Sequence, residues 1–82
     1  MMVVTICFYS YFKDLTGCAE TKEMLQAGST IEELLAKLGT RFPELAAMQR
    51  SFLVAVGVDY QDRSYVLNEG DQVSLFPPVQ GG

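Results

Sequence analysis

The stretch Thr30–Pro43, TIEELLAKLGTRFP, predicts a helix around which the rest of the chain can be arranged. Thr30 is followed three residues later by Glu33, the pattern of a capping box at a helix N-terminus. Apolar residues then recur at helical spacing, which predicts a face packed on a core. These residues are Ile31, Leu34, Leu35, Leu38 and Phe42. Pro43 ends the pattern, and the residues from Pro43 to Gln49 favour one more short helical turn.

Strand patterns flank this helix on both sides. Before it, Val3–Tyr9 is rich in β-branched and aromatic residues, and Ala19–Gln26 alternates between apolar and polar positions. After it, Phe52–Val58 and Gln72–Phe76 have the same character. Ser10–Gly17 is expected to form a short turn of helix or a loop.

Alternation within the first and last strands predicts which side chains face the core, because successive side chains of a strand point to opposite faces. The predicted inward-facing residues are Val4, Ile6, Phe8, Val73 and Leu75. Tyr9 and Phe76 then fall on the opposite face. The segment Asp59–Asp71 is predicted to be a loop, with a short extended piece at Ser64–Val66. The order of elements predicts an α+β fold, with one main helix on one face of a mixed sheet and a single domain over residues 1–82.

Composition restricts the classes of function. The 82 residues are 49% hydrophobic and 20% charged, which is typical of a globular chain with one small core. The net charge of −4 argues against nucleic acid as the main partner and favours a basic partner surface. Because no apolar run is long enough to cross a bilayer and the N-terminus lacks signal-peptide features, we expect no membrane association and a cytoplasmic location.

The two cysteines and the absence of histidine limit the chemistry that side chains could perform. Cys7 and Cys18 do not form a CxxC motif, and two thiols alone do not make a metal site. We therefore predict no metal ion and expect both cysteines to be ordinary reduced thiols. Acid–base chemistry would have to use carboxylate, lysine, tyrosine or cysteine side chains.

The chain ends in PPVQGG, a segment with two different physical properties. Pro77 and Pro78 cannot donate to a sheet, so they end the last strand and stiffen the start of the tail. Gly81 and Gly82 have no Cβ and can pass through a channel too narrow for a side chain. An extended tail over residues 77–82 would reach about 20 Å. This pattern favours a tail that enters another protein's active site; the alternative is a terminus without function.

The segment GDQVSLFPPVQGG resembles the C-terminus of the MoaD/ThiS family of sulfur carriers, and within it most the small subunits of molybdopterin synthase. SYFKDLTG, STIEELLAKLGTRFP and LVAVGVDY are similar to other segments of that family. Gly57 departs from the pattern, since relatives often carry Asn at this turn, but glycine tolerates the same backbone. The resemblance implies the β-grasp, ubiquitin-like fold.

The same resemblance implies a chemistry centred on the main-chain terminus. An adenylyltransferase of the MoeB type, consuming ATP and magnesium, would activate the Gly82 carboxylate, and a sulfur donor would convert it to a thiocarboxylate. The tail would then deliver sulfur to a pterin precursor in a large subunit of the MoaE type, with a heterotetramer as the expected assembly. The chain would bind no cofactor of its own and would be the sulfur-donating subunit of a transferase rather than an enzyme by itself.

The resemblance also implies a partner surface beside the tail. The matching family positions assign it to Tyr9, Tyr60 and Phe76; the alternative is that these are scattered surface residues or cover a second small cluster. Lys13 would be a charged contact at its rim, and Val79 the last side chain before the glycines. Two other functions stay open: a carrier for thiamine thiazole or tRNA thiolation, and a ubiquitin-like modifier or binding module.

Overall fold

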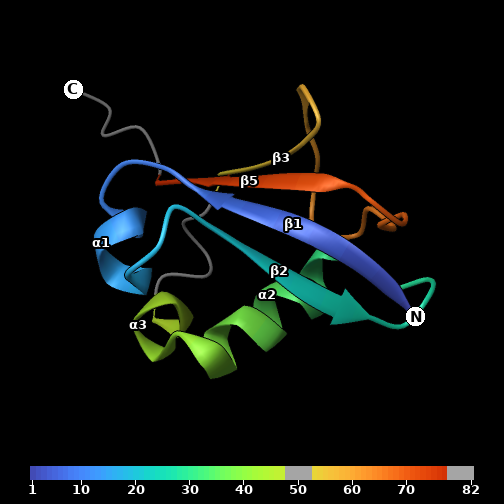
Figure 1. Cartoon of the computed structure of the whole chain (residues 1–82). Helices are drawn as coiled ribbons and strands as arrows, with labels where there is room; N and C mark the ends of the chain where they lie inside the picture. Colours follow the sequence, from blue (N-terminus) through green and yellow to red (C-terminus); the bar gives the residue numbers. More distant parts are fainter. Residues whose placement is uncertain (48–52, 78–82) are drawn as a thin grey trace.

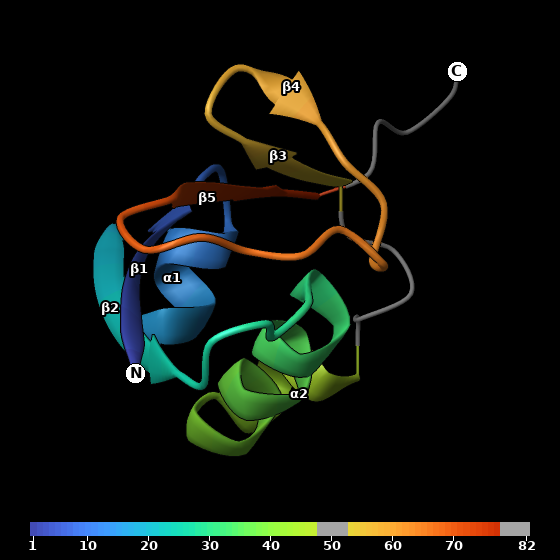
Figure 2. The same ribbon diagram turned by 90° about the vertical axis from the view of Figure 1, so that its right-hand side faces the viewer.

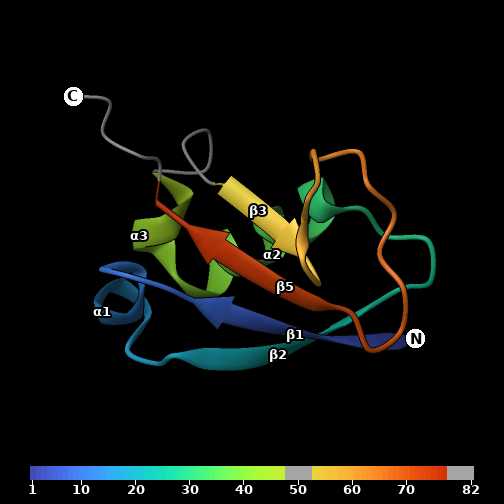
Figure 3. The same ribbon diagram turned by 90° about the horizontal axis from the view of Figure 1, so that it is seen from above.

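The computed structural model describes residues 1–47 and 53–77 and shows one mixed sheet with helices on one side. The strands are β1 (Met2–Phe8), β2 (Glu20–Leu25), β3 (Leu53–Val56), β4 (Asp59–Tyr60) and β5 (Gln72–Phe76). Their spatial order is β2-β1-β5-β3-β4, with β1 and β5 parallel and all other neighbours antiparallel. Figure 3 shows β5 between β1 and β3. The predicted α+β class is confirmed.

The helices are α1 (Phe12–Thr16), α2 (Ile31–Arg41) and α3 (Pro43–Ala46), and all lie on the same side of the sheet (Figures 1 and 2). The capping box is present: the Glu33 N–H donates to Thr30 Oγ1 at 3.3 Å, and the Thr30 N–H donates to Glu33 Oε1 at 3.0 Å. The predicted start of the helix is therefore confirmed, and α2 ends at Arg41, which agrees with the predicted stop at Pro43. The short helix predicted after Pro43 is present as α3.

The core lies between α2 and the inner face of the sheet. All five inward-facing strand residues predicted from alternation are at most 1% exposed. On α2, the four predicted residues from Ile31 to Leu38 are fully buried. Phe42 follows the helix as its C-cap and is half-buried, with its ring edge-on to Phe8 at a centroid distance of 5.7 Å. One apolar cluster therefore joins sheet and helices.

The prediction of a loop across Asp59–Asp71 is wrong in its first residues. Gly57 and Val58 form a tight turn, and Asp59–Tyr60 fold back on β3 as β4. Gly57 has φ +63°, a left-handed conformation that Asn also adopts readily, which explains the glycine at this position. The extended piece predicted at Ser64–Val66 is reduced to one isolated bridge between Thr30 and Val66. A two-residue strand is too short to leave a periodic signal.

The boundaries of three predicted strands also change. β1 starts and ends one residue earlier than predicted, and β2 is one residue shorter at each end. β3 ends at Val56 because the turn at Gly57 begins there, which leaves Val58 96% exposed. Phe52, the predicted first residue of that strand, lies outside the described residues.

Helix α2 is also fastened to β2 through a buried carboxylate. Glu23 lies opposite Val4 in the β1–β2 register, so its side chain points to the helix side, and only 7% of it is exposed. Arg41 forms an ion pair with one Glu23 oxygen, and Lys37 Nζ lies 3.8 Å from the other. Because the Glu23 carboxylate is almost completely removed from water, its burial depends on ion pairing with these two cations.

We predict that Arg41→Ala destabilises the fold by about 2 kcal/mol, because the buried Glu23 side chain would lose its nearer cationic partner and retain only the more distant Lys37. Urea denaturation measures the change. Arg63→Ala is the matched control: Arg63 lies 3.9 Å from Glu32, whose side chain is 64% exposed, and such pairs contribute less than about 1 kcal/mol. Equal losses in the two variants would contradict the prediction.

Candidate functional site

The tail leaves the sheet at the end of β5, where Phe76 and Pro77 are half-buried. Strand β5 is paired with β1 on one side and β3 on the other, so the root of the tail is held by two ladders. The remaining predicted tail residues, Pro78, Val79, Gly81 and Gly82, lie outside the described residues. The candidate site is therefore the surface from which the tail departs.

Three aromatic side chains predicted to face a partner meet at this root. The Tyr9 ring stacks on the Phe76 ring with centroids 4.8 Å apart and an interplanar angle of 12°. Tyr60 meets the Phe76 ring nearly edge-on, with centroids 6.4 Å apart. Tyr9 is 41% exposed and Tyr60 70% exposed, so much of the group remains open to solvent. The structure thus brings the three residues together, whereas their role in binding stays a prediction.

Leu53 completes this group, and the sequence prediction missed it. It lies directly opposite Phe76 in the β3–β5 register and is 36% exposed. The signal that could have found it is the alternation of β3, which buries Val54 on the inner face and so turns Leu53 outward. We call Tyr9, Leu53, Tyr60 and Phe76 the aromatic patch.

The outer face of the sheet continues from the aromatic patch as a floor of small side chains. Cys7, Ser74 and Ala55 lie side by side on β1, β5 and β3, and each is 8% exposed. None of the helices covers this face (Figure 1). Cys7 accepts a hydrogen bond from Gln72 Nε2 at 3.2 Å, and both cysteines are free thiols. Because these three residues are nearly buried although none of the helices covers them, neighbouring side chains on this face must cover them.

The turn that carries Tyr9 into α1 has an unusual backbone. Ser10 has φ +58°, the one non-glycine residue with a positive φ among those described. The Tyr9 N–H donates to the Leu75 carbonyl at 3.3 Å, and the Lys13 N–H donates to the Ser10 carbonyl at 3.2 Å. The chain thus reverses immediately after the residue that stacks on Phe76. The side chain of Lys13 is exposed on α1, and its predicted place at the rim of the partner surface stays a prediction.

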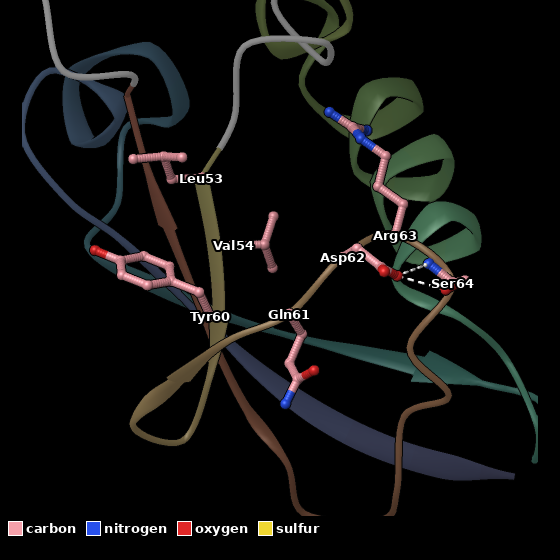
Figure 4. Close-up of a pocket in the computed structure, with 7 residues that line it drawn as sticks. All are labelled: Leu53, Val54, Tyr60, Gln61, Asp62, Arg63 and Ser64. Carbon is pink, nitrogen blue, oxygen red and sulfur yellow. Dashed lines mark hydrogen bonds between the residues drawn. The ribbon is translucent and has the colours of Figure 1, made fainter.

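A hollow of about 520 Å³ opens beside the aromatic patch (Figure 4). It is lined by Leu53, Val54, Tyr60, Gln61, Asp62, Arg63 and Ser64. The Asp62 carboxylate accepts hydrogen bonds from the hydroxyl of Ser64 and from its N–H, the latter at 2.8 Å. The Ser64 hydroxyl, and then its N–H, hold the pKa of Asp62 below its usual range. This carboxylate is therefore ionised at neutral pH.

Metal-binding clusters and membrane-spanning helices are both missing from the part of the chain that the structure describes. Within residues 1–47 and 53–77, no three His, Cys, Asp or Glu side chains gather in a way that could hold a metal ion. Across the same ranges, none of the helices is both long and apolar enough to cross a membrane.

Comparison with known proteins places this arrangement in a family. The model of the ThiS family matches residues 6–82, a range that includes the aromatic patch and the Gly-Gly end. This chain belongs to the ThiS family. The match begins within β1 and covers every later element, so the resemblance found in the sequence is confirmed.

Two relatives and one solved structure extend this result. Over 79 residues the chain is 24% identical to the molybdopterin synthase sulfur carrier subunit of Arabidopsis thaliana, covering 96% of this chain and 82% of that protein. It is 29% identical over 83 residues to the human protein of the same name, covering 96% and 93%. A Pyrococcus furiosus protein described as a candidate molybdopterin converting factor subunit 1 superposes with a TM-score of 0.88, at 23% identity, over 96% of this chain and 100% of that one. The β-grasp, ubiquitin-like fold is thereby confirmed.

The Ser10 turn generates a stability prediction. Ser10→Val should destabilise the protein by about 1–2 kcal/mol, because a β-branched residue is strained at a positive φ. Ser10→Gly should be neutral or stabilising, because glycine adopts this conformation freely. Urea denaturation of both variants measures the difference. Thr5→Val, in the extended backbone of β1, is the control for branching alone; a Ser10→Val protein as stable as Ser10→Gly would disprove the strain.

Proposed function

We propose that this chain is the sulfur carrier subunit of a molybdopterin synthase and carries sulfur as a thiocarboxylate on Gly82. The observation that supports this most is the family match over residues 6–82, together with relatives of that name aligned over nearly the whole chain. The aromatic patch at the root of the tail provides the surface that such a carrier needs. The chemistry takes place at the main-chain terminus, so no side chain of this protein needs to be catalytic.

The proposed loading has two steps. The Gly82 carboxylate attacks the α-phosphorus of ATP in an activating enzyme of the MoeB type, which releases pyrophosphate and leaves an acyl-adenylate. A hydrosulfide equivalent from a sulfur donor then forms a bond to the acyl carbon, and AMP leaves with one of the former carboxylate oxygens. The net change is the replacement of one oxygen by sulfur, with no change in the oxidation state of the carbon. The adenylate is needed because a free carboxylate is a poor electrophile.

The fold holds the root of the tail in a fixed position. Phe76 is fixed by the Tyr9 stack and by two strand ladders, so the direction in which the chain leaves the domain is set before a partner binds. Pro77 and Pro78 then limit the conformations of the next residues. A preorganised tail loses less entropy when it enters a closed pocket. Val79 would be the last side chain to fill an apolar position before Gly81 and Gly82 enter the channel.

The proposed partners are those that the family resemblance implies. The outer face with the aromatic patch would lie on a large subunit of the MoaE type, with a heterotetramer as the expected assembly. The pterin precursor would be bound by that subunit, and sulfur would pass to it from the thiocarboxylate. The net charge of −4 favours basic partner surfaces around the patch.

Loading of the terminus can be measured directly. After incubation with the activating enzyme, ATP and a sulfur source, intact-mass spectrometry should show the mass increase for one oxygen replaced by sulfur, located on Gly82. Deleting Gly82 should abolish the product without changing the melting temperature, because an exposed end contributes little to packing. Gly81→Val should slow loading because branching obstructs a narrow channel, whereas Gln80→Val, the control one residue earlier, should not. An unchanged mass for the full-length chain would refute the carrier function.

The patch can be tested by reconstitution. Phe76→Ala should weaken binding to the large subunit of the same organism by about 30-fold and reduce dithiolene formation, because aromatic anchors at interface centres typically contribute about 2 kcal/mol or more. Met24→Ala is the control: Met24 is 52% exposed on the same face of the sheet but on β2, away from the patch. The readouts are the dissociation constant and product formation from the thiocarboxylated carrier.

Two results would change the assignment. If Phe76→Ala lowers the melting temperature and leaves the affinity unchanged, Phe76 is a core residue rather than an anchor. If the loaded wild-type protein fails with its large subunit but supports thiazole synthesis or tRNA thiolation, the chain is a carrier for that other pathway. Joining of Gly82 to lysine side chains instead would identify a ubiquitin-like modifier.

A further inference from the structure

The two edge strands of the sheet, β2 and β4, differ in whether side chains occupy their outward-facing main-chain groups. At β2 these groups are occupied. The main-chain carbonyls of Lys22 and Met24 point away from β1, because the alternate residues of β2 make the β1 ladder. Arg41 donates to the Lys22 carbonyl at 3.1 Å, and Lys37 donates to the Met24 carbonyl at 2.5 Å. Two cationic side chains from α2 therefore occupy the acceptors of this edge. A partner strand could pair here only by displacing them.

The opposite edge, at β4, carries no such cover among the described residues. The Gln61 N–H donates to the Val54 carbonyl at 3.0 Å, so Tyr60, opposite Ala55, is at a position that makes no ladder bonds to β3. Its N–H and C=O consequently point to the open side of β4. Among residues 1–47 and 53–77, neither group takes part in a hydrogen bond. Figure 2 shows β4 as the outermost strand, away from the helices.

The hollow of Figure 4 lies beside β4 and is lined in part by apolar side chains. Leu53 and Val54 come from β3 and Tyr60 from β4, and the chain from Gln61 to Ser64, which follows β4, forms the remaining wall. A hollow of about 520 Å³ is larger than one side chain needs, and its lining mixes apolar surface with a few polar groups, as binding sites do.

The charges on β4 and on the chain that follows it favour a cationic partner. Asp59 is exposed on β4, Asp62 is ionised and lines the hollow, and Glu32 is 64% exposed. The only cation lining the hollow, as the described residues show it, is Arg63, and its guanidinium lies 3.9 Å from Glu32. The three carboxylates outnumber the one arginine, so the net charge of this region is negative. The net charge of the whole chain is negative as well.

We propose that the β4 edge is a strand-addition site for an extended, basic segment of a partner protein. The segment would pair with the N–H and C=O of Tyr60, place an apolar side chain against the Tyr60 ring, which is 70% exposed, and set a lysine or arginine near Asp59 or Asp62. Main-chain pairing supplies affinity in such sites, and the side-chain positions supply selectivity. The proposal does not depend on sulfur transfer, because it requires neither the tail nor Gly82.

A peptide titration of the full-length, ¹⁵N-labelled protein tests this. The probe is acetyl-Thr-Lys-Val-Lys-Val-Thr-amide, added to about 5 mM at low salt, where weak peptide binding is detectable. The expected result is shifts in the amide resonances of residues 58–63, a downfield shift of the Tyr60 amide and slower exchange of that amide with solvent. The β2 amides are the internal control and should not move, because their edge is occupied. The matched peptide with glutamates in place of lysines should bind at least fivefold more weakly, and added salt should weaken the lysine peptide.

Two variants separate backbone pairing from contact with the tyrosine ring. Tyr60→Ala and Tyr60→Pro both remove the ring, but only proline removes the edge-facing N–H, and proline is tolerated on edge strands. Tyr60→Pro should bind the lysine peptide at least fivefold more weakly than Tyr60→Ala. Asp62→Asn keeps an acceptor for Ser64 and removes the charge, so it should reduce the preference for lysine over glutamate.

Several outcomes would overturn the proposal. These are the absence of shifts at residues 58–63, equal binding of the two peptides, shifts centred on β2, and equal binding by the alanine and proline variants. Concentration-dependent shifts of residues 58–63 without peptide would show that a second copy of the chain, and not a basic segment, occupies this edge. Thiocarboxylate loading of Gly82, measured separately on the same protein, shows whether the sulfur-carrier function holds whatever the peptide result.

Discussion

The parallel pairing of β1 with β5 is the interaction on which the rest of the structure depends. It joins residues at the two ends of the chain, from Thr5 opposite Gln72 to Phe8 opposite Leu75. Because parallel neighbours cannot be joined by a tight turn, the chain must cross over between them. The helices and the β3–β4 hairpin make up that connection. The same pairing sets Ile6 beside Val73 over α2 and so assembles the core.

This pairing also fixes the functional end of the molecule. Tyr9 follows β1 directly, and Phe76 is the last residue of β5, so the parallel register brings their rings into a stack. The residue after Tyr9 takes a left-handed backbone, which turns the chain away toward α1 and leaves the stacked rings at the surface. The tail therefore starts from one of the most firmly held strands of the sheet.

The two faces and the two edges of the sheet carry different features. The inner face is covered by α2, and its buried strand residues are apolar except for Glu23, whose charge is met by Arg41 and Lys37. The same two cations occupy carbonyls at the β2 edge, so one cluster both neutralises a buried acid and protects a free strand. The outer face carries the aromatic patch, and the hollow lies beside β4. Surfaces available to partners are thus gathered on the β3–β4–β5 side of the molecule.

The sequence by itself determined the elements whose signals are local and repeated. The capping box and apolar stripe predicted α2 to the residue at its start, and strand alternation predicted the burial of Val4, Ile6, Phe8, Val73 and Leu75. It also pointed to Tyr9 and Phe76 as outward-facing, and the Gly-Gly end pointed to the family. What only the tertiary structure decided depends on contacts between distant segments. The two-residue strand β4 exists because β3 is there to pair with, Leu53 joins the patch through the β3–β5 register, and the hollow forms where the chain leaves β4. None of these leaves a periodic pattern in the sequence, because each is fixed by pairing across the sheet rather than by the preferences of neighbouring residues.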